Sequence, residues 1–571
     1  MQNIDLLVRD VRAFNSYFKT FDKVDVWISD GKILYIDRKK TRECNAKSYI
    51  DGDDRWMIPG LIDIHMHIES SMMTPAAFCD RLVECGVTTI VSEPHEMANV
   101  GGVQGVLDMI RAGENSPIDI FYGIPSSVPS TKPELETTGG VIYCKDMERL
   151  KENPAVACVG EVMNYRQIIR KNDLEISKFL KKLRTIDRLF PIEGHCPALV
   201  DLDLAKFLYL GINGDHTEHN IEELRQRFAG GMFVEIQEKM LNCEVLEFIH
   251  KHNLYEYFCF VTDDVMADTL QTQGHLDALV RKAIKDGFEP AQAVYNATFT
   301  PARRMNFFDR GALDPGKKAD FLLLDALDTF SIAATYKDGS CIYEKGAPAR
   351  TWNNGTDFAE AYYHSIRLRM QNEQTFHVKA PIMEGTVRVR AMEMRDGSTR
   401  TAERIVEMPV QGGLVQWEQS GCLLAAVLER YGKGGGIGFG FVTGDCHKRG
   451  AVATSYAHDC HNMLVAGANV KDIALAVNRL IELQGGMVAV DGGQVQAELQ
   501  LNIGGILSGR PAAEIGAALG CVRAAMEAQG YRHYNPIMSF CTLTLPVSPA
   551  LKLTDKGLID VKAACVVPLF V

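Results

Sequence analysis

"LIDIHMHIES", residues 61–70, combines the apolar content of a buried β-strand with two histidines two positions apart. Alternate residues of a strand project to the same side, so His65 and His67 are expected to point together. Pairs of this kind also occur in core strands, where each imidazole hydrogen-bonds to a neighbour. Two convergent imidazoles can alternatively bind a divalent metal ion. The rest of the chain has to decide between these interpretations.

Seven further apolar runs follow, and helix-like segments separate several of them. The runs are VTTIVSEPHE, IDIFYGIPSS, AVACVGEVMNY, LFPIEGHCP, LGINGDHTEH, GMFVEIQEK and YFCFVTDDV. In the segment TPAAFCDRLVECG, Thr74 is a suitable helix N-cap and Pro75 a suitable first helical residue. Eight alternating strands and helices are typical of a (β/α)8, TIM-type barrel. We therefore predict an α/β fold with this barrel over residues 58–309.

The sequences on both sides of the predicted barrel show the apolar alternation and turns that are typical of β-strands and hairpins. KVDVWISDGKILYID reads as a hairpin with Asp30 and Gly31 at the turn, and RGALDPGKKADFLLLD contains another strand. We expect residues 1–57 and 310–348 to build one small β-sandwich domain together. After a polar, irregular linker, residues 375–571 are expected to form a C-terminal domain of mixed α/β structure.

Composition excludes several classes of protein. The 571 residues are 46% hydrophobic and 23% charged, with a net charge of −12, so a general binder of nucleic-acid polymers is not expected. The 15 cysteines include no CxxC pair, which argues against zinc ribbons and thioredoxin motifs. No apolar run is long enough to span a membrane, and the first residues lack the pattern of a signal peptide. We expect a cytoplasmic protein with no membrane partner and with reduced thiols.

Metal-binding residue types stand at the ends of four more apolar runs. They are Glu161, His195, His216 and Asp263, with His219 less well placed beside His216. The carboxyl ends of barrel strands meet at one mouth, where active sites of this fold lie. Four of the chain's fifteen histidines at strand ends, together with a Glu and an Asp, indicate a divalent metal site with nitrogen and oxygen ligands.

The motifs PGLIDIHMHIESSMMTP, PHEMANVGG, GHCP, VTDD and AHDCHN resemble those of the bacterial and archaeal adenine deaminases, within the amidohydrolase superfamily. The resemblance covers essentially the whole chain. It implies a binuclear divalent metal centre, with one ion bound by His65, His67, Glu161 and Asp263, and a second bound by Glu161, His195 and His216. The family is associated with manganese or iron, and zinc remains an alternative.

The resemblance also implies an activity, the hydrolytic deamination of adenine to hypoxanthine and ammonia in purine salvage. A metal-activated hydroxide attacks C6 of the purine, and Asp263 passes the hydroxide's proton to the leaving amine. Glu238 is our candidate for protonating ring N1, against the alternative that it is a solvated surface carboxylate. The expected partner is a small purine base, and we expect a homo-oligomer, specifically a dimer.

Further residues are candidates for contacting the substrate or supporting the metal ligands. They are Glu69, Ser70, Ser71, His95, Glu96, Asp264, His458, Asp459 and His461. The PHE and AHDCHN segments could instead hold an extra ion, or be ordinary structural loops. Asn99 stands where an HExxH motif needs its second histidine, so a zincin is excluded.

One segment departs from the family pattern. In IQEKM, Gln237, Lys239 and Met240 replace the residues usual in adenine deaminases, and only Glu238 is kept. A deaminase of another 6-substituted purine, such as N6-methyladenine, is therefore an alternative. A cyclic amidase of the same superfamily and a catalytically inactive barrel that serves as a binding protein are further alternatives.

Overall fold

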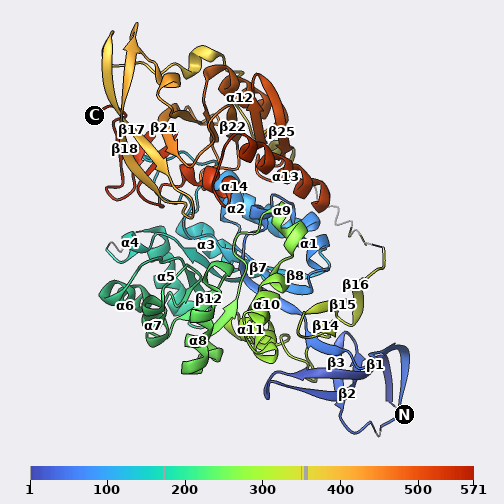
Figure 1. Ribbon diagram of the computed structural model, residues 1–571. Helices are drawn as coiled ribbons and strands as arrows, with labels where there is room; N and C mark the ends of the chain where they lie inside the picture. The colour runs from blue at the N-terminus through green and yellow to red at the C-terminus, as the bar shows by residue number, and fades with distance from the viewer. Residues whose placement is uncertain (1, 41, 171–173, 349, 351, 353–357) are drawn as a thin grey trace.

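The computed structural model describes residues 2–40, 42–170, 174–348, 350, 352 and 358–571 (Figure 1). Its middle part alternates strands and helices, an antiparallel-rich sheet lies at the N-terminal end, and a larger sheet with helices lies at the C-terminal end. No described helix combines the length and the apolarity that crossing a membrane requires.

Eight parallel strands form the middle of the chain. Five pair in the order β10-β9-β8-β7-β6 and three in the order β11-β12-β13. Single hydrogen bonds link the two sheets, from Asn213 N–H to Ile192 O at 3.3 Å and from Asp263 N–H to His65 O at 3.1 Å. The architecture is therefore TIM-type α/β, as predicted. The strands are β6 Leu61–Met66, β7 Val87–Ser92, β8 Asp119–Ile124, β9 Val156–Val162, β10 Ile192–Gly194, β11 Gly214–Asp215, β12 Phe233–Ile236 and β13 Phe258–Phe260.

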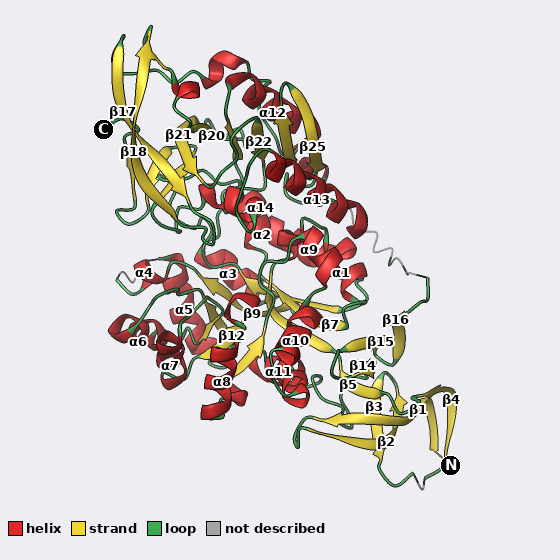
Figure 2. Cartoon of the chain, in the orientation of Figure 1, coloured by secondary structure: helices red, strands yellow, loops and turns green. Residues whose placement is uncertain are grey.

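Helices follow these strands and cover them on the outside (Figure 2). The first begins after the N-cap Thr74 with Pro75 at its start, as the sequence predicts. Their bounds are α1 Pro75–Leu82, α2 His95–Gly113, α3 Cys144–Lys151, α4 Tyr165–Ile168, α5 Glu175–Ile186, α6 Asp201–Tyr209, α7 Ile221–Ala229, α8 Cys243–His252, α9 Ala267–Gln273, α10 Leu276–Lys285 and α11 Pro290–Arg304.

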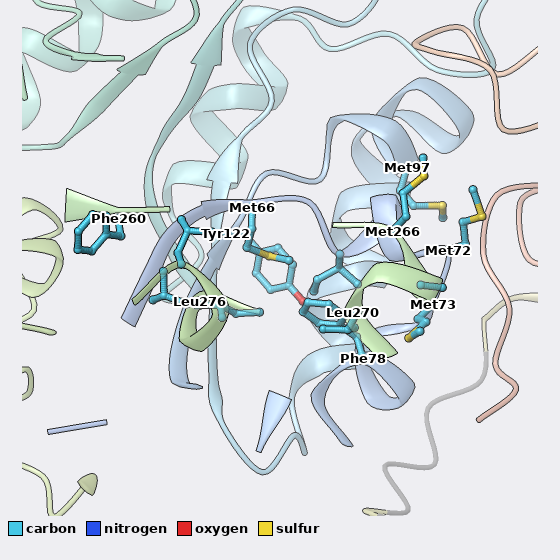
Figure 3. Close-up of a cluster of buried hydrophobic side chains, with 14 of the residues drawn as sticks. Met66, Met72, Met73, Phe78, Met97, Tyr122, Phe260, Met266, Leu270 and Leu276 are labelled. Atoms are coloured by element: carbon cyan, nitrogen blue, oxygen red, sulfur yellow. The ribbon is translucent and has the colours of Figure 1, made fainter. Parts of the chain in front are cut away.

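Apolar packing behind β6 fixes the strand that carries the two histidines. Every residue of β6 and of β7 is buried, which is typical of strands covered on both faces. Met66 of β6 belongs to a cluster that includes Phe78 of α1, Leu270 of α9 and Tyr122 of β8 (Figure 3). Burying a side chain of this size contributes about 1.5–3 kcal/mol, so the backbone at His65 and His67 is held firmly.

The strands of the two flanks pair in one sheet, in the order β16-β15-β14-β5-β1-β2-β3, with β4 beside β1. The predicted hairpin is confirmed, because β2 and β3 are antiparallel and Asp30 and Gly31 connect them with positive φ angles of 52° and 69°. The strands are β1 Gln2–Asn15, β2 Thr20–Ser29, β3 Lys32–Asp37, β4 Cys44–Asp51, β5 Trp56–Pro59, β14 Phe321–Ala326, β15 Ser331–Lys337 and β16 Ser340–Glu344.

The C-terminal region contains a nine-stranded sheet, in the order β19-β18-β17-β21-β20-β23-β22-β24-β25, and a three-stranded sheet β26-β27-β28. The strands are β17 Gly385–Met394, β18 Thr401–Gln411, β19 Leu414–Val415, β20 Leu423–Leu428, β21 Ile437–Gly444, β22 Ala451–Thr454, β23 Met463–Gly467, β24 Gly486–Asp491, β25 Gln494–Gln500, β26 Leu551–Thr554, β27 Gly557–Asp560 and β28 Cys565–Val567. The helices are α12 Val470–Leu483, α13 Ala512–Ala528 and α14 Pro536–Cys541.

This C-terminal region packs against the β/α region near α2 and α9 (Figure 1). Arg523 of α13 forms an ion pair with Asp268 of α9 at 2.6 Å. Asp555 accepts hydrogen bonds from the backbone and the hydroxyl of Thr137, in the loop after β8. These polar contacts join the C-terminal region to α9 and to the loop that follows β8.

Candidate metal centre

Strand β6 positions two histidines at its carboxyl end. His65 lies inside the strand, and His67 follows Met66 directly after it. The Nδ1–H of His67 donates to the backbone carbonyl of Glu93 at 3.0 Å, so Nε2 carries the free lone pair. His65 Nε2 is buried and has no hydrogen-bond partner. Buried polar atoms are normally paired, so an unpaired imidazole nitrogen at this place fits a metal ligand.

Three more strands bring polar groups to the same place. Glu161 lies near the end of β9, and His195 and His216 directly follow β10 and β11. His195 Nδ1 is 2.7 Å from Glu161 Oε2, and His216 Nε2 is 3.4 Å from the same oxygen. His67 Nε2 faces the other oxygen, Glu161 Oε1, at 3.6 Å. Glu161 therefore reaches two sets of histidines, as a bridging carboxylate must.

Asp263 completes the cluster from the loop after β13. Its Oδ1 is 3.5 Å from His67 Nε2 and 3.8 Å from His65 Nε2. Asp263 has a positive φ of 59°, a conformation that is uncommon for residues other than glycine and that is often found at functional sites. The backbone here is held in place by the hydrogen bond from Asp263 N–H to His65 O.

The six side chains form overlapping groups whose ligand atoms lie within 4.8 Å of one another. The groups are His65 with His67 and Glu161, Glu161 with His195 and His216, and His65 with His216 and Asp263. Imidazole nitrogens and carboxylate oxygens together suit manganese, iron and zinc. The donor set, its burial and the unpaired imidazole nitrogen therefore fit a divalent metal centre.

Charge in the cluster favours ionised carboxylates. Burial opposes ionisation, but His195 and His216 outweigh it and hold the pKa of Glu161 well below its ordinary value. His67 and His216 do the same for the pKa of Asp263. Both carboxylates are thus available as anionic ligands near neutral pH.

Comparisons with known proteins agree with these observations. The family model "Adenine deaminase C-terminal domain" matches residues 398–565, and the model "Amidohydrolase family" matches residues 56–227 and 242–342. An adenine deaminase of Clostridium perfringens strain 13 is 45% identical over 570 residues, which is 99% of each chain. An adenine deaminase 2 of Shouchella clausii is 46% identical over 570 residues, which is 100% of this chain and 99% of that one.

The chain belongs to the adenine deaminase family.

In this member of the adenine deaminase family, the residues that follow β6 lie beside the metal-capable cluster. The Ser70 hydroxyl donates to Asp264 Oδ1, and the Tyr456 hydroxyl from the C-terminal region lies 3.3 Å from Ser70 Oγ. Glu69 is fully buried, accepts a hydrogen bond from Met97 N–H, and has its pKa raised to about 7 by burial. Ser71 donates to the backbone carbonyl of Ile68 at 2.6 Å, which closes the turn after β6.

The segment that departs from the family pattern lies at the edge of the cluster. Gln237 donates from its side-chain amide to the backbone carbonyl of His216 at 2.8 Å, so it supports a metal-ligand candidate. Glu238 begins a short 3-10 helix, Glu238–Met240, with an exposed side chain, and none of the metal-capable groups contains it. His219 is also outside those groups, because its Nε2 pairs with Asp215 at 2.7 Å.

The remaining sequence candidates meet at a second place, between α2 and the C-terminal region. His95 and Glu96 begin α2, and His458, Asp459 and His461 lie in the loop between β22 and β23. All five are buried. His95, Glu96 and Asp459 form a further group with ligand atoms within 4.8 Å of one another.

Sequence reasoning missed the groups that orient the ligands. Glu93 and Gln237 act on His67 and on His216 through hydrogen bonds in which one partner is a backbone carbonyl. Asp63 accepts from the backbone N–H of His65 at 3.2 Å and from the Thr262 hydroxyl at 2.7 Å. Asp63 stands two residues before His65 on the same strand, and this spacing was the only signal that could have identified it.

Proposed function

We propose that this protein hydrolyses adenine to hypoxanthine and ammonia. The observation that carries the proposal is the convergence of four imidazoles and two carboxylates at the carboxyl ends of parallel strands, in a chain with full-length adenine deaminase relatives.

The proposed ligands of a binuclear centre are His65, His67, Glu161 and Asp263 for one ion, and Glu161, His195 and His216 for the other. Manganese or iron is the proposed metal, with zinc as the alternative, because all three accept nitrogen and oxygen donors. When bound, the cations supply the positive charge that lowers the pKa of a water and makes hydrolysis feasible near neutral pH.

Side chains of the protein then move protons between defined atoms. Asp263 accepts a proton from the attacking water, whose oxygen bonds to C6 of adenine. Glu238 donates a proton to ring N1 as electron density moves there. Asp263 returns its proton to the amine, which leaves as ammonia. The C6 hydroxyl loses its proton to Glu238, which leaves the C6 carbonyl and N1–H of hypoxanthine.

The mouth of the site is proposed to hold the purine. Glu69, Ser70 and Asp264 lie beside the proposed ligands. Ser71 stabilises the turn that contains Glu69 and Ser70. Tyr456 reaches this group from the C-terminal region. We propose that these residues contact the ring or position the groups that do.

The domain organisation predicted from the sequence is part of the same proposal. A closed eight-stranded barrel over residues 58–309 is supported by the hydrogen bonds between β13 and β6 and between β10 and β11. A small β-sandwich domain from residues 1–57 and 310–348 is supported by the pairing of β14 with β5. Residues 375–571 as a C-terminal domain and a homodimeric assembly complete the proposal.

A substrate panel with metal analysis tests the function. Protein produced with added manganese is expected to contain bound metal and to release ammonia from adenine. Release of methylamine from N6-methyladenine in preference would indicate the alternative purine, and ring opening of dihydroorotate or hydantoin would indicate a cyclic amidase. Metal-loaded protein that is inactive on the whole panel would refute the proposal.

A further inference from the structure

A second buried cluster lies outside the proposed binuclear centre, where α2 meets the C-terminal region (Figure 1). Glu96 occupies its middle. His458 Nδ1 is 2.6 Å from Glu96 Oε1, and His461 Nε2 forms a short hydrogen bond with Glu96 Oε2. Glu96 is 1% exposed, so its charge depends entirely on these neighbours.

His461 positions Glu96 and cannot itself be a metal ligand in this arrangement. Its Nδ1 accepts the backbone N–H of Ala457 at 3.2 Å, so Nδ1 carries no proton. A neutral imidazole has one proton, which must then be on Nε2, where it is donated to Glu96 Oε2. This bond fixes one oxygen of Glu96 and leaves the Oε1 side facing His95 and His458.

Asp459 contributes a second carboxylate to that side. It is 2% exposed, and its Oδ2 is buried without a hydrogen-bond partner. Within the described part of the chain, neither Glu96 nor Asp459 forms an ion pair with a lysine or an arginine. The groups that stabilise the charge of Glu96 are the imidazoles of His458, His461 and His95. An unpaired oxygen on a buried carboxylate is costly unless a cation or a hydrogen-bond donor satisfies it.

The arrangement of His95, Glu96 and Asp459 suits a small cation. One ligand atom each from His95, Glu96 and Asp459 lies within 4.8 Å of the others, and His95 Nε2 is 3.6 Å from Glu96 Oε1. Metal–ligand bonds of about 2.0–2.2 Å place neighbouring donors roughly 3–4.4 Å apart, and the His95 Nε2 to Glu96 Oε1 distance of 3.6 Å falls in this range. An imidazole among the ligands favours a first-row transition metal or zinc over calcium.

We propose that His95, Glu96 and Asp459 bind a third divalent cation, distinct from the binuclear centre. Two ligands come from the start of α2 and one from the C-terminal region, so the ion ties the two parts of the chain together. His95 Nδ1 is 3.5 Å from Glu161 Oε1, which places this site one imidazole away from the bridging carboxylate. The third ion thereby fixes the C-terminal wall of the substrate site against the metal-binding strands.

Metal stoichiometry tests the proposal. Full-length protein reconstituted with zinc or manganese and then dialysed against a weak chelator is expected to keep three equivalents per chain. Asp459→Asn is expected to keep two. The matched control is Asp491→Asn, which removes a carboxylate of the same region that pairs with Arg449 at the surface, and it should keep three. Two equivalents in the unchanged protein, or three in Asp459→Asn, would overturn the proposal.

Anomalous diffraction from crystals of the unchanged protein provides a second measurement. It does not require any variant to fold. A peak between His95, Glu96 and Asp459 at the absorption edge of the added metal is expected. An ordinary imidazole–carboxylate cluster without an ion would show no peak there and would overturn the third site. Peaks at the binuclear ligands would still be present in that case, so the two proposals fail independently.

Discussion

At the scale of single residues, Asp263 combines two tasks that can be separated. Its Oδ1 faces both His65 and His67, and the proposed mechanism gives the carboxylate a second task, that of accepting a proton. Asp263→Asn keeps one oxygen ligand but cannot accept a proton. We expect this variant to bind metal normally and to lose about 10²–10⁴-fold in kcat, the usual size of general acid–base catalysis.

The measurement for Asp263→Asn is ammonia release together with metal content. Asp286→Asn is the control, because Asp286 forms a surface ion pair with Lys282 and lies outside the cluster. If Asp263→Asn retained full turnover, the proton transfer would have to be assigned to another group.

Gly160 packs closely against the buried Glu93 side chain, beside the metal-capable cluster. A Cβ atom at this position would lie 1.5 Å from Glu93 Oε2, and the backbone of Glu93 holds His67. We expect Gly160→Ala to destabilise the protein by about 1–3 kcal/mol through overpacking and to weaken metal binding. Gly520→Ala in α13 is the control, because nothing lies within 4 Å of its Cβ.

Gly520→Ala is expected to change stability in the opposite direction. An alanine in a helix interior is favoured over glycine by about 0.5–1 kcal/mol, so the free energy of unfolding should rise. Denaturant titrations of the two variants distinguish the effects, and equal shifts for both would contradict a specific clash with Glu93.

The sequence predicted which side chains converge in the metal-capable cluster better than the groups that orient them. His65 and His67 could be found because their spacing puts two imidazoles on one side of a strand. The carbonyl of Glu93 could not be found, since every residue has a carbonyl and only the fold decides which one meets His67. Gln237 stood out as a departure from the family, but its contact with the His216 carbonyl depends on a turn that the sequence does not specify.

At the scale of elements, α7 holds two ligand-bearing loops through one buried arginine. Arg227 is fully buried, its Nε donates to Asp215 Oδ2 at 2.8 Å, and a terminal nitrogen donates to Cys196 O at 2.7 Å. Asp215 and Cys196 are the immediate neighbours of His216 and His195. The helix therefore sets the separation of two proposed ligands that lie on different strands.

Arg227→Met is expected to destabilise the protein by about 3–5 kcal/mol, because it removes the guanidinium from the buried Asp215 carboxylate and leaves it with His219, Thr217 and Cys196 as partners. It should also weaken binding of the second metal ion. Arg225→Met is the control on the same helix, since Arg225 is exposed beside Glu222, and it should barely change either property. Thermal unfolding with and without metal provides the measurement. Similar losses in both variants would show that α7 itself, rather than the Asp215 contact, is responsible.

The order of the elements could be read from the sequence, while the pairing at their ends could not. Alternating apolar runs and helical segments predicted the parallel strands, because each strand buried on both faces leaves a continuous apolar stretch. Strands as short as Gly214–Asp215 carry almost no pattern of their own, so the run LGINGDHTEH does not reveal where its strand begins and ends.

At the scale of the whole molecule, the C-terminal region contacts the residues beside the candidate metal centre. The Tyr456 hydroxyl is 3.3 Å from Ser70 Oγ, and Ser70 in turn donates to Asp264. His461 and His458 of the same region hold Glu96 of α2. The AHDCHN segment was singled out in the sequence by its concentration of metal-capable residues, but its partner on α2 could not be inferred, since the two segments are more than 350 residues apart.

A pair of tyrosine variants separates the role of this region in the active site from its role in folding. Tyr456→Phe removes only the hydroxyl that reaches Ser70 across the junction, so we expect a several-fold loss in kcat/KM for adenine with a stability loss of about 1 kcal/mol. Tyr531→Phe removes a hydroxyl that pairs with Ser539 inside the C-terminal region at 3.2 Å. It should show a similar stability loss and unchanged kcat/KM. Both tyrosines are buried, so the two variants remove comparable hydroxyl groups. An equal loss of kcat/KM in both would mean that reduced stability of the C-terminal region, and not the lost contact with Ser70, limits catalysis.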